Sequence, residues 1–357
     1  MLLKRMSVPA CPYLIPFMGL LSFLGQATKI QGRSRVVVDT DIGDDIDDAW
    51  ALALLLSDPQ LDVSLIVADS YLPEKRSEVL ARFLTQAGLA PHIAIGPGCC
   101  QNESKPLVLD GWAGPSDLKL YAGAVSLDAI SSIINEVALG AAAGEVTKVI
   151  VLSPCRAVTA ALERAPWILN HIEVYAMGGS IRVGDNGTGP PYAEWNIHAD
   201  VDSARILYEA TWQLHPPWLA PLDSAGLAQI GGAAFQMLVK CASPIVSALL
   251  AMNTAWVPRC PWQAPLSGPQ GHANASLLSS VLYDAVAASF LTVQKFLYFE
   301  TLRVSINREG RMVIDPVHGS EVYAATSWVD LPGWEMSFAQ SLCTSSSSSS
   351  SDLQITI

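Results

Sequence analysis

The segment "RVVVDTDIGDDIDDAW" (35–50) places six aspartates within ten positions, directly after an apolar run. No Lys, Arg or His occurs between Arg35 and Lys75, so no residue close in sequence compensates this charge. Two like charges about 4 Å apart repel by ~1 kcal/mol in water and by ~4 kcal/mol near a protein surface. A helix N-terminus favours acids by only ~0.3–1 kcal/mol each, which accounts for one or two of the six. The cluster therefore indicates a bound cation.

The ligand types in this segment narrow the choice of cation. Carboxylates without His or Cys indicate a hard ion, Ca²⁺ or Mg²⁺. An EF-hand is excluded, because the sixth and twelfth loop positions counted from Asp39 are Asp44 and Trp50 instead of Gly and Glu. A D-x-D phosphohydrolase, with Asp39 as nucleophile and Asp41 as acid/base, is an alternative that leaves the later aspartates without a role.

Strand-like and helix-like segments alternate outward from this stretch. Strands are expected at 35–39, 61–69, 92–96, 148–154 and 171–179, with helices at 47–57, 73–88, 126–142, 157–166 and 199–210. This alternation predicts an α/β fold, an open and mainly parallel sheet with helices on both faces, Rossmann-like, over residues 35–340. Beyond about residue 225 the pattern becomes helical.

Polar residues follow several of the expected strands directly. They are the aspartate cluster, Asp69 after "LIVA", "SPCR" (153–156) after "VIVL", and "GGS" (178–180) after "VYAM". In open parallel sheets, ligands bind beyond the carboxyl ends of the strands. We therefore expect these groups to meet at one edge of the sheet.

Several motifs, taken in order, resemble one known family, the inosine–uridine-preferring nucleoside hydrolases. "DTDIGDDIDDAWAL" is similar to that family's D-x-D-P-G-x-D-D-A signature, with two extra residues and Ile42 in place of proline. The later segments that resemble it are "VIVLSPCRAVTAAL" (149–162), "IEVYAMGGS" (172–180), "YAEWNIHADVDSARIL" (192–207), "APLDSAG" (220–226) and "LYDAVAASF" (282–290). The resemblance spans residues 35 to 315 and implies the nucleoside hydrolase fold.

The resemblance also implies residue roles in metal binding and catalysis. Asp41, Asp48 and Asp284 match the calcium carboxylates, and the backbone carbonyl of Arg156 matches a further ligand. Asp47 matches the base that activates a calcium-bound water. Because two residues are inserted, Asp44 and Asp45 are alternatives to members of the Asp47–Asp48 pair.

A second group of residues matches the family's substrate contacts. Glu194 and Asn196 correspond to ribose-hydroxyl binders, and Asn186 is a candidate for another. Tyr283 stands where the family usually has a histidine that protonates the leaving base. A phenol is a poorer general acid near neutral pH.

The two ends of the chain differ from its centre. Residues 1–27 carry a basic start, an apolar run and small residues, which predicts a secretory signal peptide cleaved before Thr28. Residues 343–357 contain a serine run that predicts a disordered tail. Without Cys11 six cysteines remain, an even number suited to an oxidising compartment, but their pairing cannot be deduced.

The sequence thus predicts a secreted, Ca²⁺-dependent hydrolase that releases base and ribose from a ribonucleoside. A phosphohydrolase and a non-catalytic Ca²⁺/ribose-binding homologue are the alternatives. The net charge of −12 disfavours nucleic acid as a partner. No membrane attachment of the mature chain is expected, and a homo-oligomer is left open.

Overall fold

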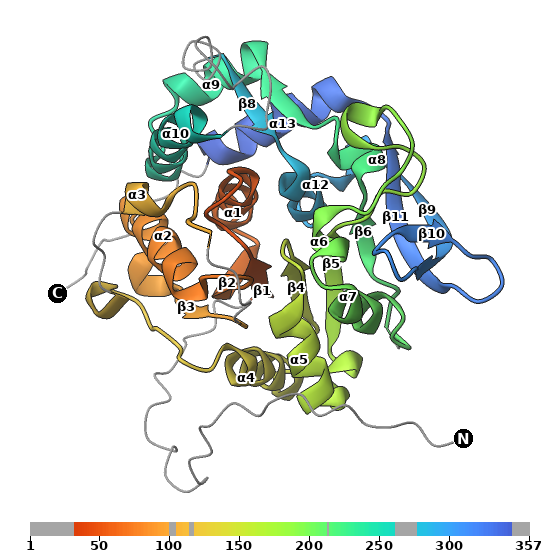
Figure 1. The fold of residues 1–357 in the computed structure, drawn as a ribbon. Coiled ribbons are helices and arrows are strands. Elements are labelled where there is room, and N and C mark those ends of the chain that lie inside the picture. The colour runs from red at the N-terminus through yellow and green to blue at the C-terminus, as the bar shows by residue number, and fades with distance from the viewer. Residues whose placement is uncertain (1–31, 100–104, 114–117, 213, 261–276, 345–357) are drawn as a thin grey trace, which may run out of the picture. The chain divides into compact units, whose positions relative to one another are not determined.

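The computed structural model describes residues 32–99, 105–113, 118–212, 214–260 and 277–344, and the predicted signal peptide lies outside them. A nine-stranded sheet runs in the order β10-β9-β11-β6-β5-β4-β1-β2-β3 (Figure 1). Its parallel strands are β1 (Ser34–Thr40), β2 (Leu61–Ala68), β3 (Ala94–Pro97), β4 (Thr147–Val151), β5 (Ile172–Met177), β6 (Trp218–Ala220) and β11 (Ser320–Trp328). The expected open, mainly parallel α/β sheet is confirmed.

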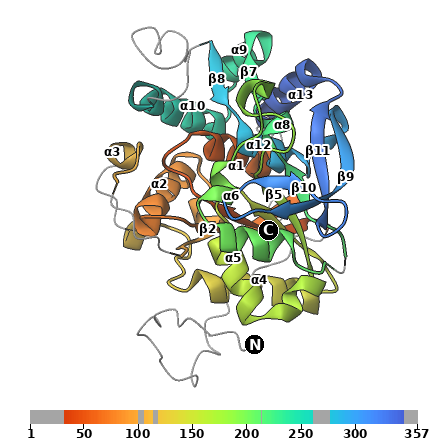
Figure 2. The ribbon, with the colours of Figure 1, turned by 45° about the vertical axis from the view of Figure 1, so that its right-hand side comes forward.

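Helices cover both faces of this sheet. They are α1 (Asp47–Ser57), α2 (Pro73–Gln86), α3 (Asp110–Ala113), α4 (Ala129–Ala142), α5 (Arg156–Arg164), α6 (Trp195–His198), α7 (Val201–Tyr208), α8 (Leu222–Ala225), α9 (Gly232–Lys240), α10 (Pro244–Trp256), α12 (Tyr283–Ser289) and α13 (Leu331–Thr344). Figure 1 shows α4 and α5 on one side of the strands and α1 on the other. Figure 2 shows α10 and α13 beyond α1, so that α1 lies between the sheet and an outer helical layer.

The apolar run of β1 explains why both faces are covered. Val36 and Val38 belong to the core cluster that contains α1, α2 and α12, whereas Val37 packs with residues of α4 and α5. All three valines are fully buried. A strand buried on both sides has a continuous β-branched run instead of alternation, as parallel strands typically do.

The C-terminal third contains strands that the helical pattern beyond residue 225 did not predict. β9 (Leu297–Ile306) pairs antiparallel with β11 and with the edge strand β10 (Met312–Ile314). A separate two-stranded sheet joins β7 (Gln229–Gly231) to β8 (Leu278–Val281). The antiparallel strands lie away from the carboxyl ends of β1, β4 and β5, so they extend the sheet without entering its central edge.

The C-terminal boundary of the domain lies later than expected. Helix α13 continues to Thr344, and a disulfide joins Cys343 to Cys241. The start predicted for the tail, residue 343, is therefore too early, and residues 345–357 lie outside the described part.

In the described segments, no single helix has both the length and the apolarity needed to span a membrane. The bent helix pair Gly232–Lys240 and Pro244–Arg259 meets these two criteria when its helices are taken together.

Candidate active site

A cavity of about 380 Å³ opens at the carboxyl edge of the central strands. Asp41 follows β1, Leu152 follows β4 and Met177 ends β5, which brings these residues to the cavity wall. The lining residues are Asp41, Asp44, Asp45, Asp47, Asp48, Lys105, Leu152, Met177, Asp185, Tyr192, Glu194, Trp195, Asn196, Leu222, Tyr283 and Asp284. The convergence expected from the strand ends therefore produces one acidic cavity at the β1/β4 crossover, where open α/β sheets bind ligands.

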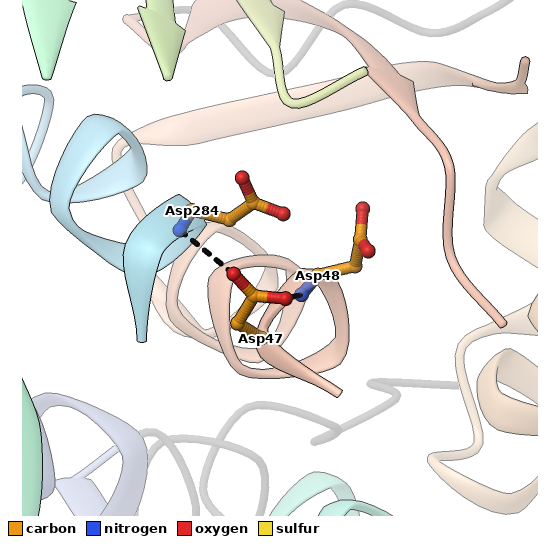
Figure 3. A group of neighbouring side chains, drawn as sticks. All are labelled: Asp47, Asp48 and Asp284. Carbon is orange, nitrogen blue, oxygen red and sulfur yellow. Dashed lines mark hydrogen bonds between the residues drawn. The ribbon is translucent and has the colours of Figure 1, made fainter. Parts of the chain in front are cut away.

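Three buried carboxylates meet where helices α1 and α12 begin (Figure 3). Asp47, Asp48 and Asp284 each offer a carboxylate oxygen, and these oxygens all lie within 4.8 Å of one another. The backbone N–H of Asp284 donates to Asp47 Oδ2 at 3.2 Å, which ties the two helices together at this point. Desolvation raises the pKa of all three carboxyls, and repulsion from neighbouring aspartates, Asp41 and Asp45 among them, raises it further.

Asp41 lies beside these three carboxylates but outside the group. Burial raises its pKa to about 6, against the opposing effect of the nearby Arg76 guanidinium. The Trp195 side chain hydrogen-bonds to this carboxyl group. Arg76 and Trp195 therefore both favour the ionised form of Asp41.

The inserted loop at 42–45 is held by the fully buried Arg76. Its guanidinium donates to the carbonyls of Asp41 and Ile42 and to Asp44 Oδ2, the last at 2.8 Å. Tyr71 donates its hydroxyl to the same Asp44 oxygen and lies with its ring 4.4 Å from the guanidinium carbon. Asp44 is thus occupied by a structural ion pair, which removes it as a substitute for Asp47 or Asp48.

Arg76→Met is expected to destabilise the protein by about 1–3 kcal/mol, because it leaves the half-buried Asp44 carboxylate and two backbone carbonyls without the guanidinium donor. Adding Asp44→Asn to Arg76→Met should recover part of that loss. Chemical denaturation of both single variants and the double variant gives the coupling energy. Strictly additive free energies of unfolding would show that the pair is not coupled.

Glu194 and Asn196 line the same cavity and are held by hydrogen bonds to the backbone. Glu194 accepts hydrogen bonds from the N–H groups of Gly179, Asn196 and Ile197, at 2.8, 2.9 and 3.4 Å. The Asn196 amide donates to the carbonyls of Leu152 and Met177. These bonds use the donors of Asn196 and leave its side-chain carbonyl as an acceptor for a ligand hydroxyl.

Seven of the predicted site residues line this cavity and two do not. Those that line it are Asp41, Asp47, Asp48, Asp284, Glu194, Asn196 and Tyr283. The Arg156 carbonyl accepts a hydrogen bond from the Thr159 hydroxyl inside α5, its side chain pairs with Asp200, and Arg156 is not among the described residues that line the cavity. Asn186 is exposed in a left-handed conformation, and its neighbour Asp185 reaches the cavity instead.

Two further positions bear on the alternatives drawn from the sequence. Asp39 is fully buried, accepts the Ser153 hydroxyl at 2.8 Å and is absent from the described cavity lining. A phosphohydrolase nucleophile at Asp39 therefore has no access to substrate. Leu152, which sequence reasoning did not select, lines the cavity, and its carbonyl accepts a hydrogen bond from the cavity residue Asn196. A backbone carbonyl leaves no signature in residue type.

The oxygen geometry at α1 and α12 fits a hard divalent cation. Ca²⁺–oxygen distances of about 2.3–2.6 Å let one ion bridge oxygens up to roughly 5 Å apart, and the triad lies within that span. The donor set consists of carboxylates only, and the nearest buried guanidinium, that of Arg76, is paired with Asp44. A cation would replace mutual repulsion by attraction in a buried place.

Comparison with known proteins assigns the family. The family described as inosine-uridine preferring nucleoside hydrolase matches residues 36–334. The chain belongs to this family. As a nucleoside hydrolase, it is an enzyme that acts on N-glycosyl bonds of ribonucleosides.

Similar nucleoside hydrolases differ in the base that their names specify. The pyrimidine-specific ribonucleoside hydrolase RihA of Salmonella paratyphi B is 27% identical over 223 residues, which cover 59% of this chain and 67% of RihA. RihA of Klebsiella pneumoniae is 26% identical, with 66% and 76% covered. The plant nucleoside hydrolase PpNRh1 has a TM-score of 0.66 at 18% identity, and the purine-preferring enzyme of Gardnerella vaginalis 0.65 at 18%, each covering 87% of this chain and 99% of the other. The two structures share the fold.

Proposed function

We propose that this nucleoside hydrolase cleaves ribonucleosides in a Ca²⁺-dependent reaction and releases free base and ribose. One observation carries the proposal: a buried carboxylate triad and the buried Glu194–Asn196 pair line one cavity. The triad suits a divalent cation, and the pair suits sugar hydroxyls. A cation and a set of hydrogen-bonding groups around one cavity are the requirements for positioning a ribose.

Asp47, Asp48 and Asp284 would hold the cation, with the Leu152 carbonyl as a further oxygen donor in place of the Arg156 carbonyl. When bound, Ca²⁺ supplies charge compensation and Lewis-acid polarisation of water and of the ribose hydroxyls. Glu194 and Asn196, fixed by backbone hydrogen bonds, hold the sugar in one orientation. Negative charge from the surrounding carboxylates stabilises an oxocarbenium-like anomeric carbon.

Two carboxylates compete for the role of general base, which takes the proton of the attacking water. The sequence assigned it to Asp47. Each oxygen of Asp47 already accepts a backbone hydrogen bond, from Asp48 and from Asp284, and Asp47 belongs to the triad. Asp41 lines the same cavity outside the triad, with an ionised form supported by Arg76 and Trp195. We therefore propose Asp41 as the base and Asp47 as a cation ligand.

A panel of ribonucleosides, assayed for free base and reducing sugar with and without a chelator, tests this function. Release of both products that chelation abolishes and Ca²⁺ restores is the expected result. Calcium-dependent binding of ribose without product would favour the non-catalytic homologue. Phosphate release from phosphomonoesters, with no release of base, would favour a phosphohydrolase. Activity that is insensitive to chelation would contradict the metal dependence.

We also propose that the enzyme is secreted. The basic start and apolar run of residues 1–27 support this, as does the Cys241–Cys343 disulfide, because disulfides persist in oxidising compartments. Asn186, in an Asn-Gly-Thr sequon, is exposed and accessible to a glycosyltransferase. N-terminal sequencing of protein from culture medium is expected to begin near Thr28. Protein that stays in the cell with Met1 intact would contradict secretion.

A further inference from the structure

Lys105 is the one cationic residue among the described residues that line the cavity. Seven aspartates and Glu194 line it as well, and no histidine does. With so many carboxylates in the same cavity, an ion pair between Lys105 and one of them would be expected. Its ammonium instead lies over two aromatic rings, 4.9 Å from the centroid of Tyr71 and 5.3 Å from that of Trp195.

The chain beside Lys105 is anchored to the inserted loop. The N–H of Leu109 donates to the Gly43 carbonyl at 2.9 Å, and the N–H of Val108 donates to Asp44 Oδ1 at 3.4 Å. Leu107 is buried. The Arg76 guanidinium already pairs with Asp44. The Asp44 charge therefore does not require Lys105, although the backbone holds Lys105 at the cavity.

The surroundings of Lys105 suit a flat aromatic ligand. Trp195 is 45% exposed and Tyr192 is 37% exposed, and both line the cavity. Exposed rings at a cavity mouth offer stacking faces, and stacking of a nucleobase on an aromatic side chain is worth about 1–3 kcal/mol. Glu194 and Asn196 are buried and line the same cavity as these exposed rings and Lys105. A nucleoside with its ribose at the buried pair could therefore place its base against the rings and Lys105.

We propose that Lys105 stabilises the nucleobase as it departs, an inference that rests on the proposed hydrolysis. In that step the bond between the anomeric carbon and the base nitrogen breaks, and its electron pair stays on the nitrogen. The water oxygen bonds to the anomeric carbon, and its proton passes to Asp41. The base leaves as an anion paired with the Lys105 ammonium and takes a proton from solvent, while Asp41 returns its proton to solvent. A fixed positive charge beside the developing anion lowers the barrier.

The test compares two leaving groups in Lys105→Met. Natural ribonucleosides have poor leaving groups, whereas para-nitrophenyl β-ribofuranoside releases a stable phenolate that needs no assistance. We expect Lys105→Met to lower kcat for ribonucleosides by about 10²-fold or more, the loss typical of one charge-stabilising donor. On the nitrophenyl riboside kcat should change by no more than a few-fold. Lys105→Arg, which keeps the charge, should retain most of the activity on ribonucleosides.

Lys240→Met is the matched control, because Lys240 is also exposed and lies on α9 outside the cavity lining. It should leave both rates unchanged. Melting temperatures with and without Ca²⁺ check that Lys105→Met is folded and binds metal. A loss in Lys105→Met that is equal for both substrates, no loss for either, or a rise in KM without a fall in kcat would each overturn the inference.

A loss confined to nucleoside 5′-monophosphates would also overturn it, because Lys105 would then be a phosphate contact. If the wild-type enzyme releases ribose from neither substrate, the proposed function itself fails and takes this inference with it. If the wild type is active and Lys105→Met does not discriminate between leaving groups, the inference about Lys105 fails alone.

Discussion

Asp41→Asn is expected to lower kcat for ribonucleosides by about 10²–10⁴, the range typical for loss of a general base. Asparagine nearly preserves the shape of the side chain and can still accept a hydrogen bond from Trp195, but it cannot take a proton at neutral pH. Because Asp41 lies outside the Asp47–Asp48–Asp284 triad, the variant should still gain stability from Ca²⁺. Steady-state kinetics and calcium-dependent melting together measure both effects.

The Asp47→Asn substitution should weaken cation binding instead of removing the general base. As a member of the triad, Asp47 is expected to contribute to cation affinity, so its variant should need more Ca²⁺ for stability and for activity. Asp45→Asn is the matched control: its carboxylate lines the cavity, but Asp45 is not in the triad. If Asp47→Asn keeps normal calcium binding and loses kcat, while Asp41→Asn stays active, the base is Asp47, as the sequence suggested.

Asp48→Ala is expected to abolish stabilisation by Ca²⁺. In the wild type, calcium at 100 times its Kd should add about 2.7 kcal/mol to the free energy of unfolding. Asp48 is fixed by a hydrogen bond from the Thr40 hydroxyl and shares the triad with Asp47 and Asp284, so its loss removes a preorganised ligand. Thermal melts across a calcium titration check this. An unchanged calcium-induced shift in Asp48→Ala would place the cation elsewhere.

The same titration should depend on pH with a definite sign. Without metal, the pKa of Asp41 is raised to about 6, and those of the triad carboxyls are raised as well. Between an unfolded value of about 4 and the folded value, the folded protein binds more protons, so metal-free stability falls as pH rises through this window. Calcium requires the ionised carboxylates. Its stabilising effect should therefore be larger at about pH 7.5 than at about pH 5.

Local pattern was sufficient to predict the part of the fold that carries the site. The β-branched run of β1, the acids that open α1 and the glycine after α2 each specify local conformation, and the bounds of α1 agree with the prediction. The antiparallel strands β9–β11 were missed. Their residues alternate between exposed and buried only in part, which hides the strand period. The three strands follow one another in sequence and pair together, and only the parallel pairing of β11 with β6 joins segments far apart in the chain.

The candidate site shows a similar division. Side chains such as Asp48 and Glu194 have types and spacings that can be recognised, and the structure places both at the cavity. Arg76 was not found because it compensates Asp44 across 32 residues, after α2 folds back on the loop. The position of the Leu152 carbonyl depends on the backbone, and the contact of Lys105 with the rings of Tyr71 and Trp195 depends on the tertiary fold. Residue identity alone encodes neither.

The hydrogen bond between Asp284 and Asp47 joins residues 237 positions apart, and this separation has a consequence for biosynthesis. At about 5–20 residues per second, a ribosome needs roughly 10–50 s to synthesise that interval. During this time, helix α1 carries two adjacent carboxylates whose third partner does not yet exist. The calcium binding that we propose for the triad would therefore await an almost complete chain. A nascent or truncated polypeptide that ends before α12 would keep its N-terminal half without the cation and without hydrolytic activity.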